Sequence, residues 1–317
     1  MAIEIGPGWT IGGGITISTP PSTPTAGWFG GGIVAYTTVN RITFATDTAT
    51  ASVRGPLASS SYLAAGTGNL TNGWFGGGYD AASVRLSSTQ RITYATDTAT
   101  TSIRGPLGAV SIGLAASSDN STYGWFSSGY NGTTVLSSTS RITYATDTAT
   151  ATNRGSLSAA RYCLYGTGTS SYGYFGGGFF FPPSATRSTI DRIDYANDTA
   201  TASARGPLNT GVNREAAITD YTTYGWFGGG KPAVSLVQRI TYSTDTATAT
   251  LRGPLTASIY ALAGVCDTTY GWFGGGTTGS PISTVTRITF ATDTATSTDR
   301  GPLSSVRRFP SATSGIQ

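Results

Sequence analysis

The sequence predicts an all-β protein built as a six-bladed β-propeller with four-stranded blades. Three observations support this fold class. A string similar to RITYATDTATTSIRGPL occurs six times, at intervals of 47 to 51 residues, and an aromatic pair precedes each copy, as in GWFGGG. A repeat of about 40 to 50 residues that holds several strand-like runs is typical of propellers. Gly, Ser, Thr and Ala dominate the composition and only 11% of residues are charged, which favours short strands over helices or disorder.

Residues 1–24 precede the repeats, and residues 25–317 form the propeller. The first part alternates isoleucine with small or polar residues, which suits an extended arm that pairs with another chain. The residues expected to make this assembly contact are Ile3, Ile5, Trp9, Ile11, Ile15 and Ile17. Pro20, Pro21 and Pro24 then predict a stiff linker.

Each repeat divides into four expected strands, and the second copy illustrates them. The first strand covers residues 62–68, where small side chains suit the crowded centre of a ring. The second is the GWF run of residues 73–75. Because its apolar residues are consecutive, both faces should be covered by neighbouring sheets, and the glycines after it permit positive φ. The third strand covers residues 91–95. The fourth covers residues 99–103 and tolerates polar residues in other copies, which marks the outer edge.

The repeated polar and aromatic residues have fixed places in every copy. The aromatic pairs are Trp28-Phe29, Trp74-Phe75, Trp125-Phe126, Tyr174-Phe175, Trp226-Phe227 and Trp272-Phe273. The arginines lie 13 residues apart, at Arg41 and Arg54, Arg91 and Arg104, Arg141 and Arg154, Arg192 and Arg205, Arg239 and Arg252, and Arg287 and Arg300. We expect these arginines to donate hydrogen bonds between strands. A formal charge of +4 spread over structural positions does not predict a nucleic-acid surface.

A tight turn, ATDTAT, joins the third strand to the fourth and carries one aspartate per copy. These aspartates are Asp47, Asp97, Asp147, Asp198, Asp245 and Asp293. Such an aspartate is expected to accept hydrogen bonds from backbone N–H groups two residues further on. No second carboxylate lies within a few positions, so the turns lack the ligand pattern of a calcium loop and no metal site is expected.

The C-terminal tail is expected to close the ring. The first repeat has no inner strand ahead of Trp28, whereas 14 residues follow Leu303. Aligned with residues 158–169, the tail places Arg307 opposite Arg161 and Phe309 opposite Cys163. The tail therefore predicts the inner strand of the first blade, which removes an open sheet edge. The alternative is that residues 11–18 fill this place.

Several classes of protein are disfavoured. Cys163 and Cys266 occupy non-equivalent places two repeats apart, and since a disulfide needs Cα atoms within about 7 Å, free thiols are expected. The N-terminus lacks the pattern of a secretory signal, and no run approaches the roughly 18 apolar residues of a membrane span. The chain has no histidine, so a Ser or Cys nucleophile would lack a histidine base. We expect no catalytic residue and no cofactor, with an enzyme that uses Asp or Tyr left open.

The order of these motifs resembles the kelch repeat. In that family the second strand ends in a Gly pair, a Tyr lies in the third strand and a tight turn precedes the fourth; in this chain Gly76-Gly77, Tyr94 and residues 96–98 take those places. Ala99 stands where the family has a Trp. The resemblance covers residues 25–317 and implies a propeller whose relatives include galactose oxidase-like enzymes, lectins and adaptors. The copper ligands of such oxidases include histidine, which this chain lacks.

A second resemblance is to repeat proteins of tailed bacteriophages. It rests on the sequence RIDYANDTATASARGPL of residues 192–208 and on the N-terminal sequence IEIGPGWTIGGGITIS. It implies a virion protein that is assembled in the host cytoplasm.

The loops between the second and third strands differ in every copy, whereas the ATDTAT turns at the opposite face are alike. Variation on one face of a constant scaffold indicates recognition there. The candidate ligand-binding residues are Tyr36, Tyr79, Tyr130, Phe179, Phe180, Phe181 and Lys231. The aromatic ones would stack on sugar rings or fill a protein pocket. The alternative is that these side chains pack on their own blades.

The leading interpretation is a non-enzymatic structural protein of a phage particle, located in a tail fibre, a baseplate or the capsid surface. Its arm would bind other virion proteins, and its variable loops would bind a host-surface glycan or protein. No nucleic-acid partner and no membrane insertion are expected, and an oligomer is compatible with this interpretation. The alternatives are a carbohydrate-binding lectin or adhesin at the bacterial cell surface, and an intracellular adaptor.

Overall fold

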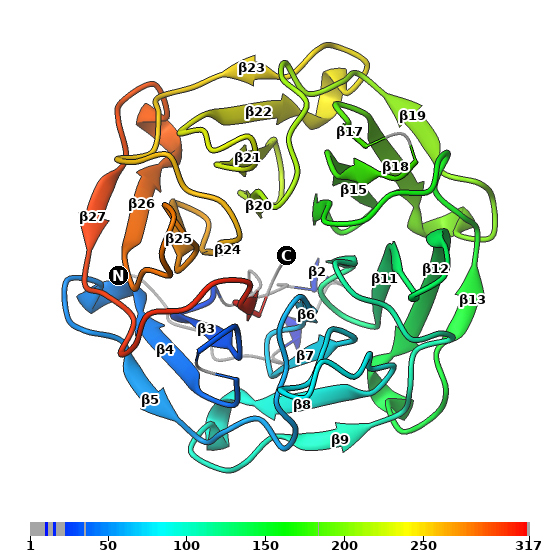
Figure 1. The fold of residues 1–317 in the computed structure, drawn as a ribbon, viewed down its shortest axis with the longest axis horizontal. Coiled ribbons are helices and arrows are strands. Elements are labelled where there is room, and N and C mark those ends of the chain that lie inside the picture. The colour runs from blue at the N-terminus through cyan, green and yellow to red at the C-terminus, as the bar shows by residue number, and fades with distance from the viewer. Residues whose placement is uncertain (1–9, 12–14, 17–22, 35, 183, 316–317) are drawn as a thin grey trace.

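The computed structural model describes residues 10–11, 15–16, 23–34, 36–182 and 184–315. Six four-stranded antiparallel sheets are arranged around a central axis as the blades of a propeller, as the sequence predicts (Figure 1). The inner strand of each blade lies at the axis and the fourth strand lies at the rim. Within the described residues the helices are single 3₁₀ turns of three residues each.

The strands of each blade follow one another from the axis outward. Blade 1 contains β28 (Ser311–Thr313), β3 (Ala26–Gly30), β4 (Val39–Thr43) and β5 (Ser52–Arg54). Blade 2 contains β6 (Ala65–Gly68), β7 (Asn72–Gly76), β8 (Thr89–Thr93) and β9 (Ser102–Arg104). Blade 3 contains β10 (Ala115–Ser118), β11 (Tyr123–Tyr130), β12 (Val135–Thr143) and β13 (Thr152–Arg154). Blade 4 contains β14 (Tyr165–Gly168), β15 (Tyr172–Gly176), β18 (Ile190–Asp194) and β19 (Ser203–Arg205).

Blade 5 contains β20 (Ala216–Thr219), β21 (Tyr224–Gly228), β22 (Val237–Thr241) and β23 (Thr250–Leu251). Blade 6 contains β24 (Ala263–Cys266), β25 (Tyr270–Gly274), β26 (Val285–Thr289) and β27 (Thr298–Arg300). Two small hairpins lie outside the blades, β1 (Thr10–Ile11) with β2 (Ile15–Thr16), and β16 (Phe179–Phe180) with β17 (Ala185–Thr186). The 3₁₀ turns that follow the third strands are η1 (Phe44–Thr46), η2 (Tyr94–Thr96), η3 (Tyr144–Thr146), η4 (Tyr195–Asn197), η5 (Tyr242–Thr244) and η6 (Phe290–Thr292).

The expected strand limits need correction at three places. The first strand begins at Ala65 instead of residue 62, because Tyr62 forms an isolated bridge to Tyr79 in the adjoining loop. The third strand ends at Thr93, since Tyr94 begins a 3₁₀ turn. The outer strand is only Ser102–Arg104, and the residues before it belong to the turn.

The C-terminal tail closes the ring, as predicted. β28 pairs antiparallel with β3, and Ala312 lies opposite Phe29 (the red segment beside β3 in Figure 1). The fully buried Arg307 guanidinium fixes this segment, because its Nη1 donates to the Thr38 carbonyl at 3.0 Å and its Nη2 to Asn40 Oδ1 at 3.1 Å. The alternative that residues 11–18 supply this strand is wrong: β28 occupies the place, and Ile11 pairs with Ile15.

Aromatic rings stack between adjacent blades. The Trp74 ring lies parallel to that of Tyr144 in the next blade, with centroids 4.2 Å apart. The equivalent pairs are Trp28–Tyr94, Trp125–Tyr195, Tyr174–Tyr242, Trp226–Phe290 and Trp272–Phe44. Phe75, which follows Trp74, is buried as well. These contacts confirm that neighbouring sheets cover both faces of the GWF strands.

A buried aspartate connects each blade to the blade before it. Asp147 Oδ2 accepts hydrogen bonds from Trp74 Nε1 at 2.8 Å and from Arg91 Nη1 at 3.1 Å, and Arg104 Nε lies 3.4 Å away. We call this arrangement the Asp–Arg–Trp cluster. The other five interfaces repeat it around Asp47, Asp97, Asp198, Asp245 and Asp293, with Tyr174 Oη as the donor to Asp245.

The predicted roles of these aspartates and arginines are therefore wrong. A backbone hydrogen bond from Ala149 N to the Thr146 carbonyl closes the turn, so the aspartate side chain is not needed there and extends to the neighbouring blade. Because each aspartate reaches the preceding blade, the two arginines that pair with it there connect two blades instead of two strands of one sheet.

A ring of six backbone hydrogen bonds surrounds the axis. In each blade one left-handed residue ahead of the inner strand donates its N–H to the carbonyl of the equivalent residue in the preceding blade, over 2.6 to 3.3 Å. These residues are Leu63, Gly113, Cys163, Arg214, Ala261 and Phe309. Phe309 and Cys163 are thus equivalent, as the alignment of the tail predicts.

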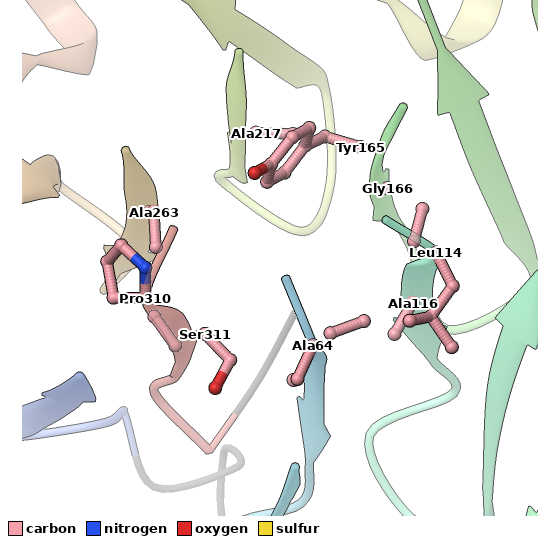
Figure 2. A pocket seen from close by; sticks show the side chains of 14 residues that line it. Ala64, Leu114, Ala116, Tyr165, Gly166, Ala217, Ala263, Pro310 and Ser311 are labelled. Carbon is pink, nitrogen blue, oxygen red and sulfur yellow. The ribbon is translucent and has the colours of Figure 1, made fainter. Parts of the chain in front are cut away.

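The axial channel is nearly filled. It is lined mainly by Ala and Gly of the inner strands and holds only about 40 Å³. Figure 2 shows the Tyr165 side chain, from β14, extending across the channel toward Ala217. The inner strands approach so closely that a Cβ on Gly66 would overlap the Ala312 carbonyl oxygen. The channel therefore offers no room for a ligand.

Candidate binding face

One face of the ring carries both the loops between second and third strands and the connections between blades. An isolated β-bridge joins the two kinds of segment in every blade. The bridges are Ile33–Arg308, Tyr62–Tyr79, Ile112–Tyr130, Tyr162–Phe179, Asn213–Lys231 and Tyr260–Thr277. We call this surface the variable face, because it carries the loops that differ between copies.

The predicted tyrosines form part of an aromatic band on the variable face. Tyr36 and Tyr79 lie on either side of Tyr62, with ring centroids 5.9 Å and 5.2 Å from it. The Arg85 guanidinium carbon lies 5.4 Å from the Tyr79 ring and 5.5 Å from that of Tyr130. These three predicted tyrosines are half-buried, so the alternative that they pack on their own blades holds in part.

The band continues into blade 4 through Tyr162. Its ring centroid lies 5.9 Å from that of Tyr130 and 5.5 Å from that of Phe179, which it meets edge to face. Phe179 and Phe180 form β16 and are half-buried, whereas Phe181 is 60% exposed. The structure therefore brings four of the predicted residues, Tyr130 and Phe179 to Phe181, around one unpredicted tyrosine.

Two open pockets share Tyr162. The pocket between blades 3 and 4 has a volume of about 540 Å³ and is lined by Tyr130, Thr133, Thr134, Tyr162, Phe180 and Phe181. The pocket between blades 4 and 5 has a volume of about 360 Å³ and is lined by Tyr162, Phe179, Thr186, Asn213, Arg214 and Lys231. Volumes of about 300 to 1,000 Å³ are typical of small-molecule sites. Tyr36 and Tyr79 line neither pocket.

The cations of the molecule fall into two groups. Among the described residues, thirteen arginines form ion pairs, namely the twelve of the Asp–Arg–Trp clusters and Arg161. Those with no ion pair there are Arg85, Arg187, Arg214, Lys231, Arg307 and Arg308, all in segments of the variable face. Of these only Lys231 is predicted as a site residue. The signal in the sequence is their position outside the repeated strings.

Two buried carboxylates lie beneath the pocket between blades 4 and 5. Asp191 Oδ2 pairs with Arg161 Nη2 at 2.9 Å, both fully buried. Glu215 is fully buried too, and this burial raises its pKa well above the ordinary value, opposed by its own backbone amide and by Arg161. Burial likewise raises the pKa of Cys163 to about 11, although Arg214 acts in the opposite direction. Both cysteines are free, as predicted.

The predicted assembly residues lie largely outside the part of the chain that the structure describes. Ile3, Ile5, Trp9 and Ile17 all fall outside it. Ile11 and Ile15 belong to β1 and β2 and pair with each other.

Two other kinds of feature are not found in the described part of the chain, a group of metal ligands and a membrane-spanning helix. There, no three His, Cys, Asp or Glu residues are grouped as metal ligands would be. Nor does any helical turn there have the length and apolar character of a membrane-spanning helix. Comparison with known proteins gives no match to a protein-family model and no significant match to a curated protein.

Proposed function

We propose that the propeller is a non-catalytic recognition module whose variable face binds a saccharide of a cell surface, and that a phage particle carries it. The observation that carries the proposal is the pair of open pockets that share Tyr162. Both lie on the face that carries the differing loops between second and third strands, while the turns between third and fourth strands on the opposite face are nearly alike.

The lining of the two pockets suits sugar rings. The aliphatic face of a pyranose packs on an aromatic ring, and the hydroxyl groups require hydrogen-bond partners around it. Tyr162 and Phe180 supply rings, while Thr133, Thr134 and Asn213 supply polar groups. The pockets belong to a closed ring of blades, so they are largely preformed, and a preformed site loses less conformational entropy on binding.

The placement in a virion rests on the resemblance to phage repeat proteins. In this proposal the arm of residues 1–24 binds a neighbouring virion protein and leaves the variable face turned toward the host. A bacterial lectin or adhesin would use the same pockets but would be found at the cell surface.

Glycan-array binding by the full chain tests the recognition role. Phe181→Ser removes an exposed ring from the pocket between blades 3 and 4, and we expect binding to weaken by about threefold to tenfold. Val53→Ser is the matched control, because Val53 is 59% exposed but lies on the outer strand β5. Absence of glycan binding, or equal weakening by both variants, would contradict the role.

The location is tested separately, by detecting the chain in purified phage particles with antibodies. A chain lacking residues 1–22 should keep its glycan binding and be lost from the particles. Detection at the bacterial surface and not in particles would favour the adhesin.

A further inference from the structure

We infer that the pocket between blades 4 and 5 binds the carboxylate of an acidic saccharide, held by Arg214 and Lys231. The inference rests on the proposed function and specifies the substrate class of that site. It is carried by the position of Arg214 in the repeat, by the two cations that line the pocket and by the lack of a carboxylate among its lining residues.

Arg214 departs from the repeat at a place where charge is otherwise absent. The equivalent residues in the ring of backbone hydrogen bonds are Leu63, Gly113, Cys163, Ala261 and Phe309. Its N–H donates to the Cys163 carbonyl at 2.9 Å and its carbonyl accepts from Ala261 N at 2.7 Å, so the backbone that carries the guanidinium is fixed. A charged residue at an otherwise apolar scaffold position points to a function rather than to folding.

The second cation, Lys231, lines the same pocket and also comes from blade 5. Lys231 N donates to the Asn213 carbonyl at 2.6 Å, which ties the loop of Lys231 to the residue next to Arg214. The Lys231 ammonium lies 5.6 Å from the Tyr260 ring, and the Arg214 guanidinium lies 5.6 Å from the Phe309 ring. Neither cation forms an ion pair with another described residue. Both charges are therefore available to an anionic ligand.

No exposed carboxylate among the pocket residues opposes such a ligand. Asp191 is neutralised by Arg161 in a fully buried pair. Burial of Glu215 raises its pKa well above the ordinary value, which favours the neutral acid. Asp80 of blade 2 accepts a hydrogen bond within its own loop, from Val84 N at 2.8 Å. The lining residues thus include two cations and no carboxylate, an arrangement that favours anions.

The neighbouring pocket indicates how a longer ligand would continue. Among its lining residues there is no charged side chain, and Thr133 and Thr134 offer hydroxyl groups. Tyr162 and the β16 hairpin separate the two pockets. A neutral sugar unit fits the pocket between blades 3 and 4, while the acidic unit occupies the pocket with Arg214 and Lys231.

Matched pairs of acidic and neutral probes test the inference, with calorimetry on the full chain. The pairs are a galacturonate hexamer with its carboxyl-reduced form, and sialyllactose with lactose. We expect the acidic member of one pair to bind at least about tenfold more tightly than its neutral partner, since hydrogen bonds to charged groups are stronger than neutral ones. Lys231→Ala should abolish this preference. Arg85→Ala, which removes an unpaired cation of the same face outside the pocket, should leave it intact.

Arg214→Leu provides the second variant, because leucine occupies the equivalent place in blade 2 and the fold should accept it. The acidic preference should fall by about tenfold with an unchanged melting temperature. Equal binding of acidic and neutral partners, or equal effects of Lys231→Ala and Arg85→Ala, would overturn the inference while leaving saccharide recognition in place. Displacement of the saccharide by inorganic polyphosphate at equal charge concentration would also overturn it. If no saccharide of either kind binds, the proposed function fails as well.

Discussion

The hydroxyl of Tyr144 lies 3.0 Å from the hydroxyl of Thr67 in the preceding blade. A tyrosine at this place bonds to the preceding blade at three further interfaces, through Tyr94, Tyr195 and Tyr242. At the remaining two interfaces the aromatic residue is a phenylalanine, and the facing residue is aliphatic. Phe290 shares a core with Ile218, and Phe44 shares one with Val265. The polarity of the two partners therefore matches at each interface.

This matching predicts that Phe290→Tyr destabilises the protein. The new hydroxyl would be directed at Ile218, whose Cδ1 already fills the space where a Cβ on Gly271 would stand, so a methyl group occupies the place where Thr67 offers its hydroxyl to Tyr144. We expect the free energy of unfolding in urea to fall by about 1–3 kcal/mol, the cost of an unsatisfied buried polar group.

A double-mutant cycle separates this cause from simple overpacking. Ile218→Thr recreates the residue that stands at the equivalent position 67, and it should recover at least about 1 kcal/mol of the loss when combined with Phe290→Tyr. Strictly additive effects of the two substitutions would show that polarity matching is not the cause.

The Asp–Arg–Trp cluster makes a second prediction. Asp147→Asn keeps the size of the side chain but removes the charge that compensates Arg91 and Arg104. Because removing one partner of a buried ion pair leaves uncompensated charge, we expect a loss of about 3 kcal/mol in the free energy of unfolding. Asp194→Asn serves as the control, since Asp194 is exposed and accepts one local hydrogen bond from Ala196 N, and it should cost less than about 0.5 kcal/mol. A similar loss for both variants would contradict a structural role of the cluster.

The sequence was sufficient for the blades but not for their contacts. Spacing and consecutive apolar residues predict where each sheet stands, because strand formation and burial are local properties of GWF and RIT. The partner of Asp147 lies 73 residues away at Trp74, so a local interpretation of the turn cannot find it. The signal available in the sequence was the constant number of these residues per repeat: one aspartate, two arginines and, in almost every copy, one tryptophan.

The candidate site was predictable only in part, for a related reason. Loop variation predicts the binding face, and the structure places Phe179 to Phe181 at the two pockets of that face. Tyr162 and Arg214 lie at the start of the expected inner strands, where the repeat pattern assigns them to the scaffold, and neither is predicted as a site residue. Their position at the pockets depends on which blades meet, and that is fixed by the ring rather than by any one repeat.

Ring closure gives a third prediction. A chain that ends at Leu303 leaves the β3 edge unpaired and removes Arg307, so we expect loss of cooperative thermal unfolding. The matched variant carries residues 304–315 ahead of Thr23 through a short Gly-Ser linker. Thr23, Pro24, Ser314 and Gly315 line one pocket, so this connection forms an ordinary hairpin. The permuted chain should recover cooperative unfolding; a truncated chain that melts as the full chain does would refute closure by the tail.

The two buried thiols give the last prediction, a loss of stability at alkaline pH. Burial raises the pKa of Cys163 and of Cys266 from 9.0 to about 11. Below pH 9 the thiols are protonated in both folded and unfolded chains, so their contribution to stability is fully present. As the pH rises above 9, the unfolded thiols ionise while the folded ones keep their protons. The free energy of unfolding should then fall by up to about 1.4 kcal/mol per pH unit for each thiol.

Buried tyrosines whose pKa is also raised, such as Tyr94 and Tyr144, add to the decline in the same range, because unfolded phenols with a pKa of about 10 begin to ionise above pH 9. The difference between the wild type and a variant without the thiols therefore measures the contribution of the cysteines. Urea unfolding above pH 9 should show the decline in the wild type. The decline should be smaller in the double variant Cys163→Ala, Cys266→Ser, which keeps only the contribution of the tyrosines. Its new residues stand at the equivalent positions Ala261 and Ser314 and should therefore be tolerated. An equal decline in both proteins would mean that the thiols do not titrate differently in the folded chain, and that groups other than the two cysteines set its alkaline limit.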